Sequence, residues 1–196
     1  MATQVPPVGP EVPTRGNPFS RAFGRFALWL AGWRFEGDIP NRAKLLFVVA
    51  PHTSNWDFVV GILAVFALDI RVSFLGKHTL FRGPLGWVMR FLGGIPVVRH
   101  ARGNVVEQTV DLIHSRPRIA LGLSPEGTRR KLPRWRTGFH YVARGAGIPI
   151  VPVALDYSTR TIRLFPLHAA GESVEDDLAQ LGGLFHPRMA RHPAQY

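Results

Sequence analysis

Short apolar runs rich in β-branched residues alternate along this chain with segments of helical periodicity, and this alternation restricts the fold more than any other feature. The predicted strands are 44–50, 72–75, 95–98, 118–123, 150–155 and 161–165. The predicted helices are 56–68, 84–92, 104–115, 138–145 and 174–181. Helices between successive strands favour parallel pairing, because the chain must cross back before the next strand begins. The sequence therefore predicts an α/β fold with a mainly parallel or mixed central sheet flanked by helices.

The length of 196 residues suits a single domain, and a hydrophobic fraction of 46% is enough for a real core. Residues 1–18 are rich in proline, with glycine and polar residues between, so we expect a flexible N-terminal arm. Residues 19–196 are then expected to form the domain. The chain has no cysteine, which excludes disulfides, cysteine-ligated metal centres and a cysteine nucleophile.

The segment after the arm predicts an N-terminal amphipathic helix. Phe23, Phe26, Leu30 and Trp33 recur at helical spacing, with arginines off that stripe. Such a helix either packs its stripe on the core or lies in a membrane interface, and both interpretations stay open here. The longest uncharged apolar run, FVVGILAVFAL, is much shorter than the roughly 20 residues that cross a bilayer, so no membrane-spanning helix is expected.

Positive charge is concentrated in the middle of the chain. Lysine and arginine total 24 against 13 acidic residues, for a net charge of +11. Residues 71–144 hold 14 of these cations and 3 acids, so this stretch carries the whole excess. Nearly all are arginines, whose planar guanidinium suits two-pronged contact with phosphate. The charge favours an anionic partner: nucleic acid, an acidic membrane surface or a phosphorylated small molecule.

A histidine and an aspartate follow the first predicted strand, in the segment PHTSNWD. His52 stands at the strand end and Asp57 in the first turn of the next helix, so the two can meet across the loop. The carboxylate would accept a hydrogen bond from one ring nitrogen and leave the other as a proton acceptor. A capped turn with an incidental histidine is the alternative interpretation.

The segment SPEGTRRK follows the predicted strand 118–123 and places three consecutive cations after a glycine turn. This pattern indicates an anion site in which Glu126 could orient an arginine or accept a substrate hydroxyl, and a solvated charged loop is the alternative. Two further cations, Lys77 and Arg99, stand at the ends of predicted strands. The proline-containing run GIPIVPV suits an edge or bulged strand that packs beside the site.

Taken in order, these segments resemble the motif blocks of the glycerolipid acyltransferase family, the 1-acylglycerol-3-phosphate O-acyltransferase-like lysophospholipid acyltransferases. The resemblance spans residues 47–155, more than half of the chain. The matching positions are His52, Ser54 and Asp57 in the first block, Gly93, Ile95 and Arg99 in the second, Pro125–Arg129 in the third and 148–153 in the fourth. Pro51, Ser124 and Arg130 are among the positions that depart from the family pattern.

The resemblance implies that a fatty acyl group passes from an acyl thioester to the hydroxyl of a lysophospholipid such as 1-acylglycerol-3-phosphate. His52, held by Asp57, would act as the general base. The residues implied to bind substrate are Lys77, Arg99, Glu126, Gly127, Thr128 and Arg129. No metal or bound cofactor is expected, and acyl-CoA or acyl-carrier protein serves as co-substrate. The charge and the N-terminal helix add an anionic membrane surface as partner, with a peripheral, cytoplasmic location on the inner face of the cell membrane.

Four other functions compete with this interpretation. The chain could act on a non-glycerophosphate lipid acceptor, or be a catalytically inert lipid-binding relative. A serine hydrolase would use Ser124, but GLSPEG is not G-x-S-x-G, and Pro125 has no N–H to donate to an oxyanion. A nucleic-acid-binding module is permitted by charge, yet no helix-turn-helix, zinc-finger or RNA-platform pattern is evident, so we expect no nucleic acid partner.

Overall fold

A seven-stranded sheet in the order β1-β7-β6-β2-β5-β3-β4 runs through the centre of the computed structural model, which describes residues 5–97, 105–127 and 134–196. All neighbouring strands are parallel except β6 and β7, which are antiparallel. The strands are β1 (Arg34–Glu36), β2 (Lys44–Ala50), β3 (Val72–Lys77), β4 (Gly94–Val97), β5 (Ile119–Leu123), β6 (Ile150–Asp156) and β7 (Thr161–Leu164). The prediction of a mixed sheet flanked by helices is confirmed.

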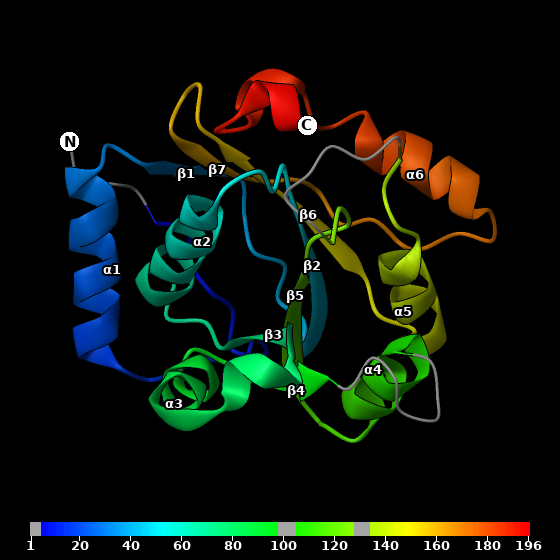
Figure 1. The fold of residues 1–196 in the computed structure, drawn as a ribbon, viewed down its shortest axis with the longest axis horizontal. Helices are drawn as coiled ribbons and strands as arrows, with labels where there is room; N and C mark the ends of the chain where they lie inside the picture. The colour runs from blue at the N-terminus through cyan, green and yellow to red at the C-terminus, as the bar shows by residue number, and fades with distance from the viewer. Residues whose placement is uncertain (1–4, 98–104, 128–133) are drawn as a thin grey trace.

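Helices cover both faces of this sheet, with α1, α2 and α3 on one side and α4, α5 and α6 on the other (Figure 1). They are α1 (Pro18–Leu30), α2 (Asn55–Ala67), α3 (Gly83–Phe91), α4 (Val105–His114), α5 (Gly138–Ala146) and α6 (Val174–Gly182), with short 3-10 helices η1 (His78–Phe81), η2 (Pro187–Met189) and η3 (Pro193–Gln195). Among the described residues, none of the helices has the length and apolar character that crossing a bilayer demands.

Strand β2 shows why the sequence folds this way. It lies between β5 and β6, and its alternate side chains enter two different cores. Leu45 and Phe47 belong to the core under α1 and α2, whereas Leu46 and Val48 belong to the core under α4 and α5. A strand buried on both faces needs an uninterrupted apolar run, which is what the segment LLFVVA supplies.

The apolar stripe predicted for helix α1 is only partly buried. Its first turn is capped by Asn17, whose side chain accepts hydrogen bonds from the next backbone N–H groups. Gly24 faces α2 so closely that an added Cβ would lie 2.6 Å from the Ala67 nitrogen. The buried side chain of α1 is therefore Leu28, on the Gly24 face, while Phe23 and Phe26 remain more than half exposed. Trp33 lies beyond the end of the helix and packs in the core.

The proline-rich N-terminal segment lies along the domain rather than apart from it, as far as residues 5–17 are concerned. Val12 is a buried core residue, and the Pro13 carbonyl accepts a hydrogen bond from Arg71 N at 2.7 Å. The Arg15 guanidinium lies over the rings of Phe66 and Phe91. Val5 and Val8 also pack against this core, so residues 5–17 make apolar contacts and backbone hydrogen bonds that their composition alone does not predict.

Candidate active site

The loop after β2 and the first turn of α2 bring His52 and Asp57 together. Ser54 caps the helix and forms a capping box with Asp57, so the carboxylate turns back over the loop. Asp57 Oδ2 accepts hydrogen bonds from the backbone N–H groups of Thr53 and Ser54, each at 2.7 Å. The same oxygen lies 3.4 Å from His52 Nδ1. The local fold thus fixes the Asp57 carboxylate, and the carboxylate in turn orients the His52 ring.

The two members of this dyad differ in their access to solvent. The Asp57 side chain is 1% exposed, whereas the His52 side chain is 29% exposed. A buried carboxylate keeps its charge close to the ring, and a partly open imidazole can meet a substrate hydroxyl. The arrangement has the geometry of a general base with an orienting carboxylate. The pairing that the sequence predicts is therefore present.

Glu126 joins the loop after β5 to the dyad. This buried residue accepts a hydrogen bond from the backbone N–H of His52, with an N–O distance of 2.9 Å. The pKa of Glu126 is raised to about 7, mainly by burial; the hydrogen bond from the His52 N–H lowers it, and the Asp57 charge adds to the rise. From the sequence, Glu126 is expected to orient an arginine or to bind substrate, and its contact with the His52 backbone is not foreseen. No local pattern could reveal it, because 74 residues separate the two partners.

Gly127 makes the turn that follows Glu126. Its φ of +61° lies in the left-handed region, and an added Cβ would lie 3.1 Å from the Arg136 side chain. Lys77 ends β3 with its side chain exposed, and β5 separates β3 from β2, so no described contact joins it to His52. Three predicted substrate-binding residues, Arg99, Thr128 and Arg129, lie outside the described residues.

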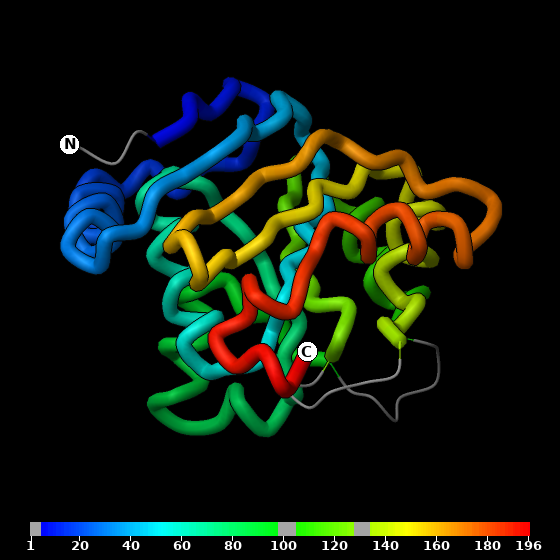
Figure 2. The backbone as a smooth tube through the Cα atoms, turned by 90° about the horizontal axis from the view of Figure 1, so that it is seen from above, coloured from blue at the N-terminus to red at the C-terminus, as the bar shows by residue number. Residues whose placement is uncertain are grey.

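The segment 186–196 also reaches the dyad loop, which the sequence analysis did not foresee. Figure 2 shows this segment, in red, beside the end of β2. The backbone N–H of His192 donates to Thr53 Oγ1 at 3.2 Å, across 139 residues of sequence. The Arg191 guanidinium lies 5.3 Å from the Trp56 ring centre and 5.7 Å from that of Tyr157. The C-terminal segment thus forms one wall of the site.

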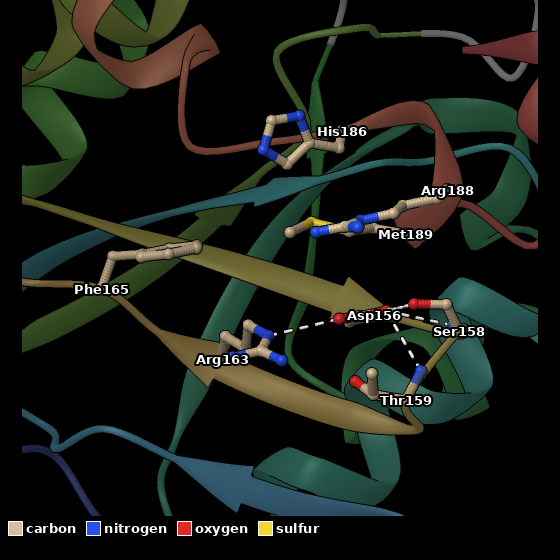
Figure 3. Close-up of a pocket in the computed structure, with 8 residues that line it drawn as sticks. All are labelled: Asp156, Ser158, Thr159, Arg163, Phe165, His186, Arg188 and Met189. Atoms are coloured by element: carbon tan, nitrogen blue, oxygen red, sulfur yellow. Dashed lines mark hydrogen bonds and ion pairs between the residues drawn. The ribbon is translucent and has the colours of Figure 1, made fainter.

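A cavity of about 360 Å³ lies between the ends of β6 and β7 and this C-terminal segment (Figure 3). Its lining residues are Asp156, Ser158, Thr159, Arg163, Phe165, His186, Arg188 and Met189. Inside it, Asp156 accepts hydrogen bonds from Arg163 Nε and from Ser158. Neither member of the dyad lines this cavity, and its acidic group is already neutralised by an arginine.

A second histidine–aspartate cluster lies on the other side of the sheet. Asp177 of α6 accepts hydrogen bonds at 2.7 Å from His140 Nδ1 and His168 Nε2. The His140 side chain is 1% exposed, so no substrate can reach it. Within the described ranges, no group of three or more histidine, aspartate or glutamate side chains is arranged to hold a metal ion.

Comparison with known proteins gives consistent results. A family model described as Acyltransferase matches residues 34–156. The chain is 30% identical over 171 residues to the 1-acyl-sn-glycerol-3-phosphate acyltransferase of Escherichia coli K12, covering 81% of this chain and 67% of that protein. The protein of the same name from Haemophilus influenzae is 30% identical over 158 residues, covering 74% and 62% respectively. The chain thus spans about two thirds of the length of these relatives.

A solved structure has the same fold. The 1-acyl-sn-glycerophosphate (LPA) acyltransferase PlsC from Thermotoga maritima superimposes with a TM-score of 0.61 at 18% identity, covering 85% of this chain and 78% of that one. The region matched by the family model contains the loop after β2, the loop after β5 and β6, which together form most of the site described above.

Proposed function

This chain belongs to the acyltransferase family, and we propose that it transfers a fatty acyl group from acyl-CoA or acyl-carrier protein to the hydroxyl of a lysophospholipid such as 1-acylglycerol-3-phosphate. The observation that carries the proposal is the buried Asp57 carboxylate, 3.4 Å from a partly exposed His52 ring, inside the region that the family model matches. The acceptor follows from the relatives, which are 1-acyl-sn-glycerol-3-phosphate acyltransferases.

The dyad performs the proposed transfer by general-base catalysis. His52 takes the proton of the acceptor hydroxyl while the oxygen attacks the thioester carbonyl. Asp57 stabilises the imidazolium that forms. The tetrahedral intermediate then collapses, the carbon–sulfur bond breaks, and the imidazolium returns its proton to the leaving thiolate. No acyl-enzyme and no cofactor enter this sequence, and the base contributes about 10²–10⁴-fold to the rate.

The acceptor headgroup is proposed to bind between the loops after β3, β4 and β5. Arg99, Arg129 and Lys77 supply the positive charge for a phosphate, and guanidinium groups suit its geometry. Gly127, which makes the turn after Glu126, and Thr128 complete the proposed headgroup-binding residues. Glu126 has two roles in this scheme: it binds substrate, and its side chain accepts a hydrogen bond from the backbone N–H of His52.

The experiment that tests this function offers labelled acyl-CoA and labelled acyl-carrier protein to the protein with a panel of lysolipids, and products are read by mass spectrometry. We expect the acylated product of 1-acylglycerol-3-phosphate. Acylation of a different lipid only would move the protein to the non-glycerophosphate alternative. No acylation of any lysolipid by folded protein would indicate the inert lipid-binding alternative and refute the proposal.

The membrane contact is proposed to form on the face that carries α1 and α3, which would place the protein on the inner surface of the cell membrane. Phe19 of α1 is 86% exposed and Trp87 of α3 is 71% exposed. Trp87 stacks on the exposed ring of Phe91, whose carbonyl oxygen accepts a hydrogen bond from Arg15. Exposed aromatics together with a strongly basic chain suit the interface of an anionic bilayer.

Point substitutions test the membrane contact better than deletion of the N-terminal segment, because Val12, Leu28 and Trp33 are core residues. We expect Phe23→Ser with Phe26→Ser to weaken flotation with vesicles of anionic phospholipid several-fold. Tyr141→Ser, a substitution of a half-exposed aromatic on the opposite side of the sheet, is the matched control. Equal flotation of both variants and the parent protein would contradict an interfacial α1.

A further inference from the structure

Two polar atoms behind the dyad are buried without a hydrogen bond of standard geometry among the described residues: Asp57 Oδ1 and the hydroxyl oxygen of Tyr157. The other carboxylate oxygen, Oδ2, accepts from two backbone N–H groups and faces His52. A buried carboxylate oxygen without a donor is unfavourable, because it has lost its water and gained nothing in exchange. A protein donor beside Asp57 Oδ1 would remove this cost.

The fold brings Tyr157 to this place. Tyr157 directly follows β6, and β6 pairs in parallel with β2 in the register Ala50 to Ala154. The residues after both strands consequently leave the sheet at the same edge. The Tyr157 ring is held edge-on against Trp33, with ring centres 5.0 Å apart, and its backbone N–H donates to Met189 O. These contacts fix the ring independently of its hydroxyl.

The Tyr157 hydroxyl is a suitable donor. Burial, followed by the nearby Asp57 carboxylate, raises the pKa of this hydroxyl well above its ordinary value, so it keeps its proton throughout the working range. Arg191 lies over the same ring and opposes that rise, but no ion pair joins it to Asp57 among the described residues. The hydroxyl is thus the neutral donor beside the unsatisfied oxygen.

We propose that Tyr157 is a positioning residue for the dyad: its hydroxyl donates to Asp57 Oδ1 in the working enzyme and holds Oδ2 toward His52. The role of this residue rests on the proposed function of His52 and Asp57. With both oxygens bound, the carboxylate cannot rotate, and part of its charge is shared with the hydroxyl. Without the hydroxyl, the full charge faces the imidazole and favours its protonated form.

The test is Tyr157→Phe, which keeps the ring and its packing and removes only the hydroxyl. We expect kcat to fall about 3- to 30-fold, KM for both substrates to stay within about twofold, and the melting temperature to change little. We also expect the pKa of His52 to rise, as followed by NMR of the histidine rings. Tyr141→Phe is the matched control, since Tyr141 lies on α5, away from the dyad.

The NMR measurement separates this inference from the proposed function, because it needs no turnover. The His52 signal is identified by its loss in His52→Ala. The other charged or titratable groups around the dyad loop are Asp57 beside the ring, Glu126 on the His52 backbone, and Arg191, His192 and Tyr196 of the C-terminal segment, which interact with Trp56, Thr53 and Glu126 respectively. Glu126→Gln in both backgrounds removes the carboxylate that titrates near neutral pH. An unchanged or lowered His52 pKa in Tyr157→Phe, or an unchanged kcat in an active enzyme, would overturn the proposal.

Discussion

The two histidine–aspartate clusters, on opposite sides of the sheet, use the same residue types for different ends. In the cluster of α5 and α6, Asp177 accepts from His140 and His168 at 2.7 Å, and all three groups are largely buried. In the dyad, the imidazole of His52 is partly open and lies 3.4 Å from Asp57. A buried ring that is bound to a carboxylate stabilises a fold, whereas a partly exposed ring can exchange a proton with a substrate.

Hydrogen bonding explains this difference. Burial alone would raise the pKa of Asp177, but hydrogen bonds from His168, His140 and Gly171 outweigh it and hold that pKa below its ordinary value. Both oxygens of Asp177 are thereby used to join α6 to α5 and to the segment before α6. Asp57 uses Oδ2 both for the backbone N–H groups of its own loop and to face the His52 ring, which stays partly exposed.

The largest effect should come from His52→Ala. Removal of the proposed base is expected to lower kcat by about 10²–10⁴-fold while the melting temperature changes little, since the ring is partly exposed. Turnover and thermal unfolding, measured on the same preparation, test both halves of this expectation. Turnover near that of the parent protein would remove His52 from the chemistry and erase the contrast between the clusters.

Asp177→Asn should show the opposite pattern. The change leaves two buried imidazoles without their carboxylate, and we expect the free energy of unfolding to fall by about 3 kcal/mol. Acyl transfer per folded molecule at low temperature should be nearly unchanged. Urea unfolding measures the stability, and Asp176→Asn on the same helix is the matched control. A stable but inactive Asp177→Asn variant would show that this cluster belongs to the active site.

Glu126→Gln should give the smallest effect. It adds to the comparison because the stability contributed by Glu126 and that contributed by Asp177 change with pH in opposite directions. The pKa of Glu126 is raised, so its contribution to stability is complete below the ordinary value of 4.5 and is lost as pH rises toward about 7. The lowered pKa of Asp177 gives the reverse, stability that is lost as pH falls.

The amide of Glu126→Gln still accepts the His52 N–H and cannot ionise. We therefore expect the variant to be more stable than the parent by about 1–2 kcal/mol at pH 8, after allowance for solvent screening, and equal to it near pH 4.5. Urea titrations at both pH values measure the difference. A difference that is independent of pH would show that ionisation of Glu126 costs the fold nothing.

Much of the fold could be predicted because strands and helices of an α/β domain are set by local patterns. The run LLFVVA and the pair His52 and Asp57 are close in sequence, and both are found where the pattern placed them. Strand β1 was missed, since three residues become a strand only through pairing with β7. The outward face of α1 was equally hidden, because the burial of Leu28 depends on how near Gly24 lets α2 approach.

The parts of the site that could not be predicted depend on contacts across long stretches of chain. Glu126 holding His52, His192 reaching Thr53 and Tyr157 lying behind Asp57 all join segments whose spacing carries no periodic signal. Composition and motif order indicate which residues are candidates for the chemistry. They do not identify the residues that position these side chains, because positioning depends on the three-dimensional packing.

The hydrogen bond between Glu126 and His52 makes two motif loops, 74 residues apart, into one mechanical unit. Substitutions within this pair of loops should therefore combine non-additively, even where the altered side chains never touch. Any exchange of the loop after β5 to alter acceptor choice would also shift His52, the proposed base. Selectivity and rate in this enzyme are thus properties that must be redesigned together.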